Sequence, residues 1–173
     1  VHGIVKSYGG DIGVDTAPGK GATFDIHLPT IQAAAAPAAR QTRLPQGTER
    51  ILLVDDEAFI VDFGRQCLER LGYRVDGCTS SAEALECIRR APQRYDLVIT
   101  DMTMPQMTGD QLASEILRLR PDLPVILCTG YSSRLDGRQA ETMGISALLM
   151  KPINLEDLAS NVRRVLDGSA ARS

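Results

Sequence analysis

Side chains that could do chemistry follow four short apolar runs of the sequence, each at the point where its run ends. They are the acid pair Asp55 and Asp56, the third acid Asp101, the threonine Thr129 and the lysine Lys151. Apolar runs of this length, bounded by turn residues, predict buried strands. In open α/β sheets, chemistry takes place just beyond the C-terminal ends of parallel strands. We therefore predict that these side chains meet at one edge of a parallel sheet.

The types of these side chains indicate phosphoryl transfer. Three carboxylates close together repel one another, so a cation between Asp55, Asp56 and Asp101 would stabilise the group, and all-oxygen ligation suits Mg²⁺. Lys151 would add a positive charge and Thr129 a hydroxyl. Together they predict a pocket in which a carboxylate accepts a phosphoryl group, whose oxygens the metal, the lysine and the threonine contact. Taken alone, Asp101 could instead be a structural residue that caps the next turn.

The elements that must position these groups alternate between strand and helix five times, from Glu49 to about Gly168. We expect strands at 51–54, 73–78, 96–100, 124–128 and 147–150. We expect five helices, of which the fourth, at 135–143, is weaker. The inner faces of the other four are expected to be Ile60, Cys67, Leu68 and Leu71; Ala84, Leu85 and Ile88; Leu112, Ile116 and Leu119; and positions 155, 158, 162, 165 and 166. Ser80 with Glu83, Thr108 with Gln111, and Asn154 are predicted N-terminal caps. Five such units predict an α/β fold, a doubly wound five-stranded parallel sheet of flavodoxin-like order 2-1-3-4-5.

The first part of the chain has a different pattern. Residues 1–8 are expected to be a helix end, and residues 11–15 and 22–28 to be the strands of a hairpin. Residues 30–48, rich in alanine and proline, predict a flexible linker, and 169–173 a disordered tail. His2 and His27 are far apart and have no metal-ligand partners, so we interpret both as packing or surface residues.

Composition excludes several classes of function. The formal net charge of −3 argues against a nucleic-acid partner. No apolar run approaches the roughly 18 residues that a membrane helix needs. The four cysteines, at 67, 78, 87 and 128, lack metal-ligand spacing and predict small core residues of a reduced, cytoplasmic protein.

The motifs Leu52–Glu57, Asp101–Pro105, Cys128–Tyr131 and Lys151-Pro152 together resemble the receiver domain of two-component signalling, over residues 49–168. The resemblance implies that Asp101 is the phospho-acceptor. It implies Mg²⁺ ligands from Asp55, Asp56 and Asp101 and from the backbone carbonyl of Thr103. Lys151 and Thr129 would bind the phosphoryl oxygens, and the peptide before Pro152 would be cis.

Residues 1–29 resemble the C-terminal end of the ATP-binding domain of a histidine kinase. Its nucleotide-binding boxes and phosphorylated histidine would precede Val1, so we expect this chain alone to lack ATP-dependent kinase activity. The order of segments resembles the C-terminus of a hybrid sensor histidine kinase, with no output domain after Gly168. Phosphate would come from a phosphohistidine of the parent kinase. It would leave to water or to a histidine phosphotransfer protein.

Leu148 departs from the receiver pattern, because receivers often carry tyrosine or phenylalanine three residues before the lysine. That aromatic side chain moves inward on phosphorylation, so the coupling of phosphorylation to the neighbouring helix and strand is expected to differ here.

Two other classes of function remain as alternatives. A phosphatase resembling the haloacid dehalogenases would need a second acid two residues after the nucleophile, where this chain has Thr103. The other is an interaction module that resembles a receiver but is not phosphorylated. Such modules usually lose one member of the set formed by the acid pair Asp55 and Asp56, Asp101, Thr129 and Lys151, and this chain keeps them all.

Overall fold

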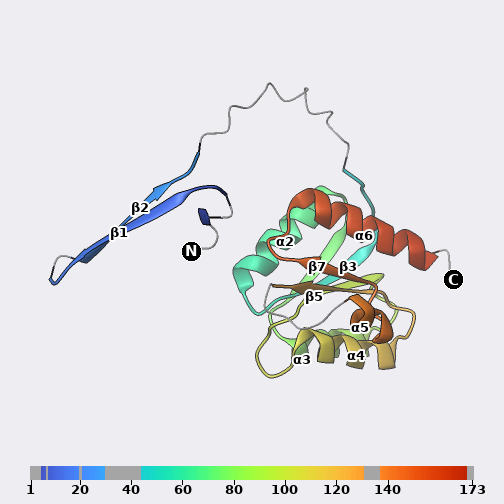
Figure 1. Cartoon of the computed structure of the whole chain (residues 1–173). Helices are drawn as coiled ribbons and strands as arrows, with labels where there is room; N and C mark the ends of the chain where they lie inside the picture. Colours follow the sequence, from blue (N-terminus) through green and yellow to red (C-terminus); the bar gives the residue numbers. More distant parts are fainter. Residues whose placement is uncertain (1–4, 7, 20, 30–43, 131–136, 171–173) are drawn as a thin grey trace. The chain divides into compact units, whose positions relative to one another are not determined.

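The computed structural model describes residues 5–6, 8–19, 21–29, 44–130 and 137–170. The chain divides into two compact units, Val1–Thr42 and Arg43–Ser173 (Figure 1). The C-terminal unit contains the predicted alternation of strands and helices, and the N-terminal unit contains the predicted hairpin. In the described part of the chain, no helix is both long enough and apolar enough to cross a membrane.

A five-stranded parallel sheet forms the centre of the C-terminal unit, with the strand order β4-β3-β5-β6-β7. The strands are β3 (Arg50–Val54), β4 (Arg74–Cys78), β5 (Leu97–Asp101), β6 (Val125–Thr129) and β7 (Ala147–Met150). This order confirms the predicted order 2-1-3-4-5. It makes β5, which ends at Asp101, the neighbour of both β3 and β6, so Asp55 directly after β3 and Thr129 at the end of β6 flank it.

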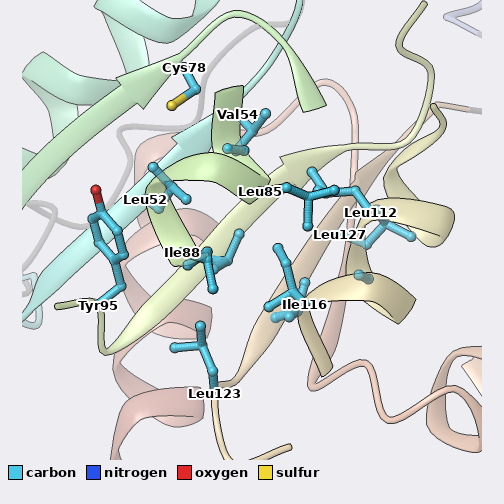
Figure 2. Packing of buried hydrophobic residues seen from close by; sticks show 14 of the residues in the cluster. Leu52, Val54, Cys78, Leu85, Ile88, Tyr95, Leu112, Ile116, Leu123 and Leu127 are labelled. Atoms are coloured by element: carbon cyan, nitrogen blue, oxygen red, sulfur yellow. The ribbon is translucent and has the colours of Figure 1, made fainter. Parts of the chain in front are cut away.

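Helices cover both faces of this sheet, as the doubly wound prediction requires. Helices α2 (Ala58–Arg70) and α6 (Leu155–Ala170) lie on one face, and α3 (Ser81–Arg90), α4 (Gly109–Leu119) and α5 (Gly137–Thr142) lie on the other (Figure 1). Strand β3 shows why the sequence needs both layers. Ile51 and Leu53 pack with α2 and α6, whereas Leu52 and Val54 pack with α3 and α4 (Figure 2). A strand that is apolar on both faces is stable only when both faces are covered.

The predicted caps position the helices. Ser80 Oγ accepts a hydrogen bond from Glu83 N–H at 3.2 Å, and Asn154 Oδ1 accepts one from Asp157 N–H at 2.8 Å. Glu83 Oε2, however, accepts from Thr79 N–H at 3.3 Å, one residue before the predicted partner Ser80. Gln111 Oε1 accepts from Thr108 N–H at 3.2 Å.

The structure corrects the expected helix faces and ends. Leu119 and Leu155, which we expected on inner faces, are 45% and 38% exposed. Each is a terminal residue of its helix, where neighbouring elements no longer cover the apolar stripe. Helix α6 continues to Ala170, so the first two residues of the predicted tail are helical, and residues 171–173 lie outside the described part. The weak helix expected at 135–143 is α5, and residues 131–136 lie outside the described part.

Residues 44–48 were predicted to be flexible but pack against the C-terminal unit. Gly47 N–H donates a hydrogen bond to the Leu71 carbonyl at 3.1 Å, and Leu44 contacts the apolar layer under α6. The next residue, Glu49, forms an ion pair with Arg163 of α6 at 2.8 Å. The predicted linker is therefore wrong at residues 44–48, and its residues 30–43 lie outside the described part.

The N-terminal unit contains the antiparallel hairpin of β1 (Asp11–Ala17) and β2 (Gly21–His27). Its pairing places Val14 opposite Phe24, and these two side chains are 56% and 62% exposed. Val5 and Lys6 are helical, as expected for a helix end. His27 is exposed on β2, and His2 lies outside the described residues.

Candidate functional site

Asp101 is the last residue of β5 and reaches the C-terminal edge of the sheet. Only 8% of the residue is exposed. The backbone N–H of Thr103 donates a hydrogen bond to Asp101 Oδ2 at 2.8 Å. The loop that follows the strand therefore holds one carboxylate oxygen, and the other contacts Lys151.

Lys151 lies between two carboxylates. Its Nζ is 2.7 Å from Asp101 Oδ1 and 3.1 Å from Asp55 Oδ2. The peptide between Lys151 and Pro152 is cis, as the resemblance implied. Burial by itself would lower the pKa of Lys151, but hydrogen bonds to Asp101 and Asp55 outweigh burial and raise that pKa above its ordinary value. One ammonium group thus offsets part of the negative charge of two nearly buried acids.

Asp55 is held from the backbone as well. It is 4% exposed, and its Oδ1 accepts a hydrogen bond from Glu57 N–H at 3.0 Å. Its own N–H donates to the carbonyl of Cys78, the last residue of β4, at 3.3 Å. The orientation of the Asp55 carboxylate therefore depends on both the start of α2 and the end of β4.

The remaining predicted site residues occupy different environments. Thr129 is 1% exposed at the end of β6, and its carbonyl accepts a hydrogen bond from Lys151 N–H at 2.7 Å. Asp56 and Thr103 are exposed. Within the described ranges, no group of three or more histidine, cysteine, aspartate or glutamate side chains is arranged to hold a metal ion. The structure thus brings together Asp55, Asp101, Thr129 and Lys151, and leaves Asp56 at the rim.

Gly109 was not identified from the sequence, yet it positions Asp101. It begins α4, and its N–H donates to the Met102 carbonyl at 2.9 Å. A Cβ atom built on Gly109 would lie 2.0 Å from the Asp101 carbonyl oxygen and 2.6 Å from Leu127 Cδ1. Only glycine therefore allows α4 to approach the end of β5 this closely. The sequence signal was a glycine directly after the Thr108 cap, which by itself is uninformative.

A pocket of about 420 Å³ opens beside the acids, between α2 and α6. Its lining combines apolar side chains with Asp55, Asp101 and Lys151. On α2, Phe59 and Phe63 stack with their ring centroids 6.5 Å apart and are 76% and 59% exposed. Exposed aromatic side chains grouped beside a pocket are typical of surfaces that bind other molecules.

Cys128 lies opposite Asp101 across strands β5 and β6, and it is not a competing nucleophile. Burial raises the pKa of its thiol to about 12, with Asp101 and Asp55 adding to the effect and Lys151 opposing it. A thiol of that pKa stays protonated at neutral pH, and the thiolate is the reactive form.

The chain is similar to known proteins in both sequence and fold. A family model described as "Response regulator receiver domain" matches residues 51–163. Sensor kinase CckA of Brucella abortus (strain 2308) is 34% identical over 96% of this chain, and the aerobic respiration control sensor protein ArcB of Escherichia coli (strain K12) is 32% identical over 95%. The chain spans 19% of the length of CckA and 21% of ArcB.

Solved structures show the same fold. A response regulator receiver domain protein from Clostridium thermocellum has a TM-score of 0.69 and 30% identity, covering 72% of this chain and 99% of its own. A CheY-like receiver domain protein from Methanospirillum hungatei JF-1 has a TM-score of 0.68 and 32% identity, covering 73% and 100%.

Proposed function

Because the chain belongs to the response regulator receiver family, we propose that Asp101 accepts a phosphoryl group from a phosphohistidine as one step of a phosphorelay. The observation that carries the proposal is the position of Lys151 Nζ, 2.7 Å from Asp101 Oδ1 and 3.1 Å from Asp55 Oδ2. A carboxylate nucleophile needs a neighbouring positive charge before an anionic phosphoryl group can approach it. Lys151, which directly follows β7, supplies that charge beside the acid at the end of β5.

The donor set suits Mg²⁺, which prefers carboxylate and carbonyl oxygens and keeps several waters. Asp55 and Asp101 are nearly buried acids that share one lysine, and Asp56 directly follows Asp55 at the rim. We propose that these three side chains and the carbonyl of Thr103 hold the ion. Bound there, Mg²⁺ would neutralise charge on the oxygens of the transferred phosphoryl group.

The residues of the chain then have distinct roles in the transfer. An Asp101 carboxylate oxygen attacks phosphorus as the bond to the donor nitrogen breaks, which forms an aspartyl phosphate. Lys151 contacts a phosphoryl oxygen in place of one of its present carboxylate partners. The hydroxyl of the nearly buried Thr129 donates a hydrogen bond to another phosphoryl oxygen. Asp55 stays in place because Glu57 N–H holds its Oδ1 at 3.0 Å.

We also propose a parent protein and partners. The alignments with the sensor kinases CckA and ArcB extend over 96% and 95% of this chain, which supports a hybrid histidine kinase as the parent. The exposed apolar face of the hairpin suits the last part of a kinase ATP-binding domain, where other elements would cover it. The donor would then be a phosphohistidine of the same parent. The acceptor would be water or a histidine phosphotransfer protein that covers Phe59 and Phe63.

Labelling by a small phosphodonor tests the proposed function. Acetyl phosphate with Mg²⁺ should add one phosphoryl group to the chain, because the site itself supplies most of the catalysis. Intact mass spectrometry should show the adduct, and peptide mapping after borohydride trapping should locate it at Asp101. Chelation of Mg²⁺ by EDTA before the donor is added should prevent labelling. A chain that labels equally well in EDTA, or that never labels, would contradict the proposal, and the second outcome would favour an interaction module.

Leu148 provides a second prediction, about the response to phosphorylation. It is half-buried against the layer that contains α4, and it has no aromatic ring to move inward. Addition of a beryllofluoride mimic should therefore change amide exchange in the residues that follow Asp101 and Thr129 more than in α5 and β7. Leu148→Tyr should enlarge the changes in α5 and β7, and Leu148→Met is the matched control. Large changes across residues 137–150 in the parent chain would be the contrary result.

A further inference from the structure

Two cysteines outside the acid site are in contact. Cys78 ends β4, Cys87 lies in α3, and their Sγ atoms are 4.0 Å apart. Cys78 is 3% exposed and belongs to the apolar layer shown in Figure 2, while Cys87 is half-buried against that layer. A disulfide needs an S–S distance of about 2 Å. Rotation of the two side chains must therefore shorten the distance between the Sγ atoms by about 2 Å.

We propose that Cys78 and Cys87 form a modification site, at which a hydroperoxide makes an intramolecular disulfide. The two thiols differ in access, and this difference sets the order of the steps. Cys87 is the one that a small oxidant reaches. Cys78 is 3% exposed, so an oxidant in solution does not reach its sulfur directly. Cys87 therefore reacts first, and Cys78 acts as the resolving thiol.

The chemistry balances with hydrogen peroxide as the oxidant. Cys87 sulfur attacks one peroxide oxygen, the O–O bond breaks, and one water leaves, which gives a sulfenic acid. Cys78 sulfur then attacks Cys87 sulfur. The S–S bond forms, the S–O bond breaks, and the hydroxyl leaves as a second water with the proton of Cys78. The two thiols lose two electrons and hydrogen peroxide is reduced to two waters.

The site is connected to the acid cluster through the backbone. Asp55 N–H donates to the Cys78 carbonyl at 3.3 Å, and Asp55 Oδ2 is 3.1 Å from Lys151 Nζ. A disulfide that draws Cys78 toward α3 changes this amide hydrogen bond. The oxidation state of the pair is therefore transmitted to one of the two acids that share Lys151.

The test is mass spectrometry of the full chain after treatment with hydrogen peroxide. The tryptic peptide 75–89 contains both cysteines. After oxidation, denaturation and alkylation, this peptide should lack two hydrogens and carry no alkyl group, and dithiothreitol should restore two alkylatable thiols. The peptides with Cys67 and Cys128 should be alkylated in full. A doubly alkylated peptide, a sulfinic acid at Cys87, or a link from Cys87 to another cysteine would overturn the proposal.

Single substitutions separate the pair from the other thiols. Cys87→Ser replaces a half-buried residue and should leave Cys78 fully alkylatable after oxidation and denaturation. Cys67→Ser, also at a half-buried position, is the matched control and should still form the disulfide. In the parent chain, the Asp55 amide resonance should shift on oxidation and return on reduction. An unmoved Asp55 resonance in the oxidised chain would overturn the coupling to the acid cluster.

Discussion

Asp101→Asn should reduce labelling by acetyl phosphate to the background level. The substitution keeps the shape of the side chain and its hydrogen bond from Thr103 N–H, which is 2.8 Å long in the parent. It removes the negative oxygen that we propose attacks phosphorus, so no other interaction should compensate. Intact mass spectrometry with and without the donor measures the result. Asp62→Asn is the matched control, because Asp62 is an exposed acid on α2 that lies outside the acid cluster.

The neighbours of Asp101 should give graded losses in the same experiment. Lys151→Ala removes the cation 2.7 Å from Asp101 and should slow labelling about 100-fold, the usual cost of losing one group that stabilises transferred charge. Thr129→Ala should have a smaller effect in the same direction. Asp56→Asn should raise the Mg²⁺ concentration needed for half-maximal labelling. Labelling of Asp101→Asn at the parent rate would mean that another residue is the acceptor.

Lys151→Ala should also make stability depend on Mg²⁺. Without the lysine, Asp55 and Asp101 remain nearly buried with no shared cation, and their repulsion destabilises the folded state. Bound Mg²⁺ would supply the missing charge. Addition of Mg²⁺ should therefore raise the thermal unfolding midpoint of this variant more than that of the parent. Equal effects of Mg²⁺ on both chains would contradict the proposed ligand set.

Gly109→Ala should strongly destabilise the C-terminal unit. The added Cβ would lie 2.0 Å from the Asp101 carbonyl oxygen, a backbone atom that cannot move without displacing β5. Overpacking of this kind costs about 3 kcal/mol of unfolding free energy, which lowers the unfolding midpoint by roughly 10 °C in a domain of this size. Calorimetry or circular dichroism measures the midpoint.

The matched control for this substitution is Gly168→Ala. Gly168 lies in α6, and a Cβ built there has no neighbour within 4 Å. Alanine in a helix is favoured over glycine, so this variant should be stabilised by about 0.5–1 kcal/mol. A midpoint for Gly109→Ala equal to that of the parent would show that α4 can move away from Asp101 at little cost.

The sequence by itself determined the fold and the identity of the chemical groups. Short apolar runs with an amphipathic helix after each one are local patterns, and they were sufficient to predict the strand order that the structure shows. Caps such as Asn154 with Asp157 are also local, because the two residues are three positions apart. Four motifs, which contain Asp55 and Asp56, Asp101, Thr129 and Lys151, together indicated the family before any distance was known. Local patterns failed at helix ends, where Leu119 is exposed because coverage depends on the neighbouring elements.

Only the tertiary structure decided how the groups of the site are paired. Lys151 shares its charge between Asp55 and Asp101, while Asp56, the neighbour of Asp55 in sequence, is exposed. The close approach of Gly109 to Asp101 and the contact of Cys78 with Cys87 could not be predicted from the sequence either. These are contacts between different elements, at distances of a few ångströms, and packing of whole strands and helices sets them. Periodicity in the sequence reports which face of an element is buried, but it carries no information about which atoms meet there.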